Sequence, residues 1–149
     1  MKKEFHFEVT TRWQHGEFEN LKSHVSKVNG LDELVISAAS EFKGDKQHHN
    51  PEDLLLRSLS SCHMMSYFYV CQQHGIELLR YSDQATGTLT LREDNSGAFS
   101  KVVLQPIMRL KDESQETLAL SLHQKAHELC FIANSVSFLV EIFPTTTSQ

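Results

Sequence analysis

Three cysteines are the side chains of this sequence best suited to covalent chemistry, and they lie at positions 62, 71 and 130. A cysteine thiolate can act as a nucleophile, as a metal ligand or as one half of a redox-active disulfide. An odd number of widely spaced cysteines argues against a disulfide scaffold and favours a reducing compartment. We therefore expect a cytoplasmic protein in which each cysteine is a packing residue, a ligand or a nucleophile.

Cys62 lies in the middle of a predicted helix, where its neighbours three, four and seven residues away are mostly apolar. The ordinary role of such a cysteine is that of a small apolar packing residue. If Cys62 is a nucleophile, a positive charge must come from elsewhere in the fold. His63 cannot be its base within one helix, because adjacent residues point about 100° apart, so a simple Cys–His dyad is disfavoured.

The other two cysteines support different interpretations. Cys71 follows Cys62 by nine residues, which places it on the opposite side of a helix and roughly 13 Å along the axis, so we interpret it as structural. Cys130 follows His123 and His127 by seven and three residues, and all three share a face if the helix runs that far. A metal site there stays open as an alternative, although histidines four residues apart also arise by chance.

The elements that must position these residues are strand hairpins and two helices. The motif N-P-E-D at 50–53 supplies a cap, a first-turn proline and two acidic residues, which predicts a helix from Pro51 to His74 that ends at Gly75. Asp112 and Gln115 resemble a capping box for a second helix, roughly Glu113 to Cys130. Alternating patterns and turn signals predict strands over 5–9, 17–28, 34–36, 84–92, 99–110 and 136–143, with a loop over 40–49 and a frayed tail after Pro144.

The resulting order, β-β-β-α-β-β-α-β, predicts an α+β fold in one domain over residues 1–149. Apolar residues cover much of the circumference of the first helix, so we expect it to be a long central helix buried on more than one face. The composition, 40% hydrophobic and 22% charged residues, is that of a globular domain.

Charge and hydropathy exclude two classes of partner. The chain has 14 basic and 19 acidic residues and no basic run, so nucleic acid is not expected as a partner. The longest apolar stretch, 129–140, is interrupted by polar residues and falls short of the roughly 20 residues that cross a bilayer. We therefore expect no membrane partner.

Three features together resemble the OsmC/Ohr family, named for osmotically inducible protein C and organic hydroperoxide resistance protein. They are the segment NPEDLLLRSLSSCHMMSY at 50–67, the segment KAHELCFIANSV at 125–136, and the order of the elements around them. The glutamate of N-P-E precedes a helical cysteine by ten residues, and a second cysteine follows that one by 68 residues. The resemblance covers nearly the whole chain.

The resemblance implies thiol-dependent reduction of organic hydroperoxides in an intertwined homodimer whose long helices are buried by the partner's sheet. Cys62 matches the cysteine that attacks the peroxide, and Cys130 matches the resolving cysteine that closes a disulfide. Glu52 matches a glutamate that pairs with an arginine beside the reactive thiolate. No cofactor is implied; an external dithiol, in this family a lipoylated protein, restores the thiols.

The sequence departs from the family at that arginine. Alignment on FENLKSH places Lys22 there, and lysine keeps the charge but loses the planar fork that holds a carboxylate. Arg12 is the alternative to Lys22 as the residue that takes the place of this arginine in the folded structure. The departure leaves open a binding or stress-response protein that keeps the fold with weakened or no peroxidase activity. Two other hypotheses stay open on other residues: a metal-binding protein that uses His123, His127 and Cys130, with or without Cys62, and a cysteine hydrolase or acyltransferase, which needs a histidine base near Cys62.

The spacing of Glu52 and Cys62 also predicts a site shared between two chains. Ten residues on a straight helix span about 15 Å, which is too far for a carboxylate to orient groups at the thiolate. No proline or glycine interrupts the run from Leu54 to Tyr69. We therefore expect Glu52 to act at the Cys62 of a neighbouring subunit.

Overall fold

The computed structural model describes residues 2–149 and divides the chain into two compact units that meet between Leu55 and Leu56. The α+β class is confirmed, while the single domain over residues 1–149 stays a prediction. The strands are β1 (Thr10–Arg12), β2 (His24–Lys27), β3 (Leu34–Ile36), β4 (Leu78–Asp83), β5 (Thr86–Leu91), β6 (Gly97–Leu104), β7 (Pro106–Leu110), β8 (Leu139–Ile142) and β9 (Thr145–Thr146). The helices are α1 (Pro51–Gln73) and α2 (Glu116–Leu129), with short 3₁₀ turns η1 (Ser40–Phe42), η2 (Glu113–Gln115) and η3 (Ala133–Ser135).

The first unit contains a small antiparallel sheet of order β1-β2-β3. The middle strand β2 pairs with both neighbours, and Val25 at its centre is buried. In the loop that follows β3, a side chain at Gly44 would meet the Ala38 carbonyl oxygen at 1.7 Å, so only glycine fits this close approach.

The caps of α1 confirm the ends that the sequence predicts. Asn50 Oδ1 accepts the Asp53 backbone N–H at 2.8 Å, and Asp53 Oδ2 accepts the Asn50 amide at 3.0 Å, so side chains satisfy two groups at the helix start. At the other end Gly75 has φ +68°, and the Ile76 N–H donates to the Cys71 carbonyl at 2.9 Å. This left-handed residue ends the helix, as a glycine C-cap does.

Only one stripe of α1 is buried within the chain. Its buried residues are Leu59, His63, Tyr67, Val70 and Cys71. The apolar side chains of Met65, Phe68 and Tyr69, off this stripe, are 57%, 41% and 54% exposed. These three side chains stay partly exposed among the described residues, so burial of α1 on more than one face is not seen within a single chain.

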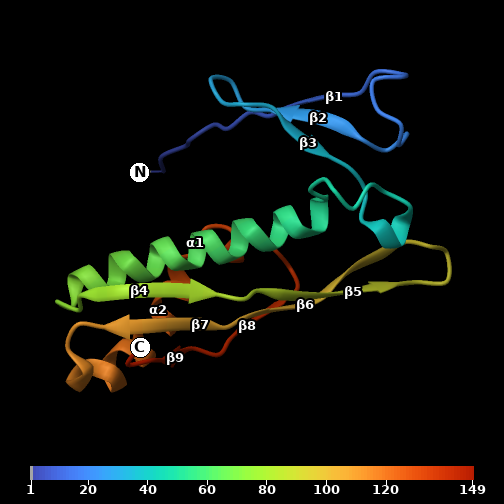
Figure 1. The fold of residues 1–149 in the computed structure, drawn as a ribbon. Coiled ribbons are helices and arrows are strands. Elements are labelled where there is room, and N and C mark those ends of the chain that lie inside the picture. The colour runs from blue at the N-terminus through green and yellow to red at the C-terminus, as the bar shows by residue number, and fades with distance from the viewer. Residues whose placement is uncertain (1) are drawn as a thin grey trace. The chain divides into compact units, whose positions relative to one another are not determined.

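The second unit holds two three-stranded sheets, of order β4-β7-β9 and β5-β6-β8. Antiparallel pairing joins β4 to β7 and β5 to β6, while β9 and β8 add in parallel to β7 and β6. Helix α1 packs along β4 (Figure 1), where Tyr67 and Phe68 contact the Tyr81 ring. The core behind these contacts consists of Tyr67, Val70, Cys71, Ile76, Met108, Leu110, Ala119, Leu122 and Ala126.

The predicted long strand over 99–110 is wrong, because the chain forms β6 and β7 on either side of Gln105. The Gln105 N–H donates to Asp83 Oδ1 at 2.7 Å, and the other oxygen of that carboxylate accepts the Ser60 hydroxyl. Pro106, which follows, has no N–H to donate. The N–H of Gln105 is therefore taken by a side-chain acceptor and Pro106 has none to donate, so β6 and β7 separate at this point although Pro106 itself pairs with Asp83 in β7.

Other expectations near the chain ends are also wrong. The alternating segment 5–9 is not a strand, and its apolar members Phe5, Phe7 and Val9 are 77%, 95% and 62% exposed. Only His24–Lys27 of the expected strand 17–28 pairs, and β4 was not predicted. The tail beyond Pro144 is ordered as β9, because Thr145 and Thr146 pair with β7.

Candidate functional site

Two cysteines distant in sequence are brought together by α1 and the end of α2. Cys62 is partly buried on α1, and Cys130 lies directly after α2 and is 1% exposed. Burial raises the pKa of the Cys130 thiol to about 11, and a side-chain hydrogen bond with Cys62 contributes to the rise. Both are free thiols, and the structure places them near each other.

The backbone after α2 fixes the position of Cys130. The helix ends at Leu129, and Cys130 is extended with φ −71° and ψ 112°. The Ala133 N–H donates to Cys130 Sγ at 3.4 Å, and the Asn134 N–H donates to the Cys130 carbonyl at 3.0 Å. Cys130 therefore does not continue the helical face of His123 and His127, which was the condition for a three-residue metal face. Among residues 2–149 no group of three or more His, Cys, Asp or Glu side chains is placed to hold a metal ion.

Cys71 is separate from this pair. It belongs to the hydrophobic core, where it is 2% exposed, and burial raises the pKa of its thiol. Its side chain interacts with Tyr67 rather than with another cysteine. The placement agrees with a structural role.

The charged residues predicted for the site lie in the first unit, and they are not paired with one another. The Lys22 ammonium donates to the Phe42 carbonyl, and the Arg12 guanidinium binds Glu17 through two hydrogen bonds of 2.7 and 3.1 Å. Glu52 Oε2 is buried and has no hydrogen-bond partner among the described residues. A buried carboxylate oxygen without a hydrogen bond is costly, so the position of Glu52 Oε2 favours a donor that the described residues do not supply.

The structure also reveals a buried histidine pair that sequence reasoning missed. His63 Nε2 and His123 Nδ1 are 2.9 Å apart, and His123 Nε2 lies 3.3 Å from Met108 Sδ. The Tyr67 ring stacks on His123 with a centroid distance of 3.8 Å. The signal was present in the sequence, because His63 occupies the four-residue spacing of the buried stripe between Leu59 and Tyr67.

Burial keeps both imidazoles neutral. Desolvation lowers the pKa of His63 to about 4 and that of His123 to about 3. The charge of His127 lowers the pKa of His63 further, while Asp83 opposes the shift. Neutral rings can share a single N–H between them, whereas two imidazolium rings would repel each other.

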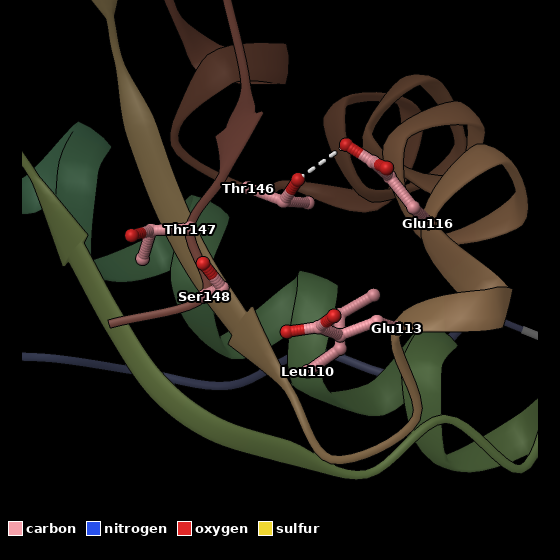
Figure 2. A pocket seen from close by; sticks show the side chains of 6 residues that line it. All are labelled: Leu110, Glu113, Glu116, Thr146, Thr147 and Ser148. Carbon is pink, nitrogen blue, oxygen red and sulfur yellow. Dashed lines mark hydrogen bonds between the residues drawn. The ribbon is translucent and has the colours of Figure 1, made fainter.

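Three clefts in the second unit lie apart from the cysteine pair. One of about 240 Å³ is lined by Glu113, Glu116 and hydroxyl groups of the C-terminal segment (Figure 2), where the Thr146 hydroxyl donates to Glu116. A second, of about 580 Å³, lies between α2 and β8 and is lined in part by His127 and Glu141. A third, of about 500 Å³, lies at the end of α1 beside Phe68 and Ile76. No lining residue of the three clefts is Cys62 or Cys130.

Comparison with known proteins finds relatives of this chain. A family model described as OsmC-like protein matches residues 44–142. YmaD, an uncharacterized protein of Bacillus subtilis, is 27% identical over 112 residues, which are 72% of this chain and 73% of YmaD.

Solved structures extend the comparison to the whole fold. An OsmC-like protein of unknown function from Vibrio cholerae superposes with a TM-score of 0.84 at 25% identity, covering 95% of this chain and 99% of the other. An organic hydroperoxide resistance protein from Elizabethkingia anophelis has a TM-score of 0.75 at 18% identity and covers 100% of both chains, a likeness in fold. Within residues 2–149, no helix is both long and apolar enough to cross a membrane.

Proposed function

Because this chain belongs to the OsmC-like protein family, we propose that it reduces organic hydroperoxides to alcohols with Cys62 and Cys130. The observation that carries the proposal is the proximity of these two thiols, one on α1 and the other directly after α2. The fold shared with proteins described as organic hydroperoxide resistance proteins supports the choice of substrate.

The reaction balances with the two thiols and one external dithiol. The Cys62 thiolate attacks the terminal oxygen of the hydroperoxide, the O–O bond breaks, and the alcohol leaves after protonation. The resulting sulfenic acid is attacked by the Cys130 sulfur, which forms the disulfide and releases water. A dithiol, for which a lipoylated protein is our candidate, reduces the disulfide and becomes oxidised itself. The cycle uses no metal or organic cofactor.

The proposed role of Glu52 is to orient groups at the thiolate of a second copy in a homodimer. Its buried oxygen without a partner is what a site completed by another chain would contain. Lys22 or Arg12 would supply the cation beside it, although within this chain each is bound elsewhere. A reducing compartment such as the cytoplasm suits three free thiols.

A second candidate is a binding or stress-response protein that keeps the fold with weakened peroxidase activity. The observation that favours it is the absence of an ion pair between Glu52 and either Lys22 or Arg12 among the described residues. Peroxide consumed per Cys62 thiol separates the candidates, since a binding protein with weakened or no peroxidase activity consumes little or none.

The test of the proposal compares cysteine variants of the reduced protein with cumene hydroperoxide and hydrogen peroxide. We expect Cys62→Ser to abolish reaction. Cys130→Ser should react once and then stall or over-oxidise, because no thiol resolves the sulfenic acid. Cys71→Ser is the matched control and should turn over like the wild type. Full turnover by Cys62→Ser would exclude the mechanism, and faster reaction with hydrogen peroxide would exclude the organic substrate class.

A further inference from the structure

A line of polar contacts runs along the interface between α1 and α2. Near one end, the Tyr67 hydroxyl donates to the Ala119 carbonyl at 2.7 Å. The His63 and His123 rings meet one turn closer to the cysteines, and at the far end Cys62 lies near Cys130. The two helices are therefore antiparallel, and the histidine pair is the side-chain contact next to the thiols.

The hydrogen-bond partners of the pair determine its tautomers. A thioether sulfur can only accept, so His123 Nε2 carries the proton that faces Met108 Sδ. His123 Nδ1 then has a lone pair and accepts the N–H of His63 Nε2. His63 Nδ1 is left as a lone pair, and it is buried without a hydrogen-bond partner among the described residues. The contact is thus a directed donor–acceptor bond with only one arrangement of protons.

Such a bond constrains the two helices more than apolar packing would. Apolar side chains tolerate small slides and rotations, whereas a buried hydrogen bond weakens steeply when its angle and distance change. The stacking of Tyr67 on His123, with 15° between the ring planes, holds the acceptor ring in orientation. His63 is adjacent to Cys62 in α1, so any rotation of α1 that breaks the bond also moves Cys62.

We propose that the hydrogen bond from His63 to His123 is a positioning device that holds Cys62 against Cys130 and so sets how readily their disulfide closes. The proposal rests on the two-cysteine function. It adds a distinct claim, that the effective concentration of one thiol at the other depends on two imidazoles that take no part in bond making. His63 and His123 are positioning residues in this sense.

The test measures the equilibrium between the Cys62–Cys130 dithiol and its disulfide in glutathione redox buffers, without any peroxide. A Cys71→Ser background leaves only the two thiols of interest. Replacing His123 with leucine removes the acceptor, and His63→Leu removes the donor. A net hydrogen bond of about 1 kcal/mol corresponds to roughly a five-fold fall in the constant for disulfide closure. The double leucine variant should fall no further than either single variant, because both remove the same contact.

Two further variants separate positioning from general loss of structure. His63→Gln places an amide N–H near the position of Nε2 and should restore closure to nearly the wild-type value. Leu122→Ala removes a buried contact of α2 outside the polar line, so it should lower the free energy of unfolding without changing the closure constant. If the leucine variants do not fold, His63→Asn, whose side chain is too short to reach His123, takes their place.

The outcomes separate the two proposals. Unchanged closure in the histidine variants, with a disulfide that forms normally, would overturn the positioning role and leave the two-cysteine function standing. Failure of Cys62 and Cys130 to form any disulfide in the wild-type background would overturn both. An equal loss of closure in Leu122→Ala would also refute the claim, because it would assign the effect to core stability.

Discussion

Lowering the pH from 7 to 5 should destabilise the protein through His63 and His123, whose burial makes protonation unfavourable in the folded chain. Their pKa values are about 4 and about 3, compared with 6.5 for an ordinary histidine. The unfolded chain therefore binds more protons than the folded chain between about pH 3 and 6.5. The free energy of unfolding therefore rises with pH across that window. The contribution of the two neutral rings is fully present above pH 6.5 and is lost as the pH falls.

The size of this effect on the free energy of unfolding follows from the difference between the histidine pKa values in the unfolded and the folded chain. At pH 5 both rings are mostly neutral in the folded chain. In the unfolded chain they are mostly charged, because pH 5 lies about 1.5 units below the ordinary histidine pKa. At 1.36 kcal/mol per unit, each ring removes about 2 kcal/mol of unfolding free energy, or about 4 kcal/mol for the pair. Asp83 moderates the loss, because its charge favours the protonated form of His63.

Urea unfolding at pH 7 and pH 5, at one fixed protein concentration, measures this difference. The comparison variant carries His63→Gln and His123→Asn, which replace both rings with amides that do not titrate. The wild type should lose about 4 kcal/mol more than this variant between the two pH values. His6→Gln, at an exposed position, is the control and should behave like the wild type. An equal loss in the wild type and the double variant would refute the assignment of neutral, buried imidazoles.

Two further predictions concern the reductant and the assembly. Dihydrolipoamide should support peroxide turnover better than glutathione at matched thiol concentration, because its second thiol closes a ring and drives release; equal rates would count against a dithiol partner. Mixing Glu52→Ala chains with Cys62→Ser chains should restore activity toward roughly a quarter of the wild-type value, since one site of each heterodimer regains both residues. No recovery after confirmed subunit exchange would show that Glu52 and Cys62 serve the same chain's site.

Local signals in the sequence determined the elements that carry the thiols. The Asn50–Pro51 start and the Gly75 end of α1 depend on backbone groups within a few residues, so the sequence pattern was enough to place them. The family resemblance also rests on short segments, and the OsmC-like match over residues 44–142 confirmed it.

Strand limits needed the tertiary structure, because strand pairing depends on partners far along the chain. The long strand expected over 99–110 breaks at Gln105, since the acceptor for its N–H is Asp83, which is 22 residues away. The tail at Thr145 and Thr146 is ordered because β7 offers a free edge to it. The prediction of a strand over 5–9 rested on alternation alone, and within the described residues no other strand pairs with this segment.

Some features of the candidate site were likewise predicted from the sequence, and others required the tertiary structure. The sequence by itself identified Cys62 and Cys130 as residues of interest and separated Cys71 from them by helix geometry. The resemblance already implied that these two thiols meet, whereas only the tertiary structure paired His63 with His123 across 60 residues of chain. A helical pattern specifies which face a residue occupies, but the identity of the side chain that meets it depends on how two helices pack, and that depends on the whole core.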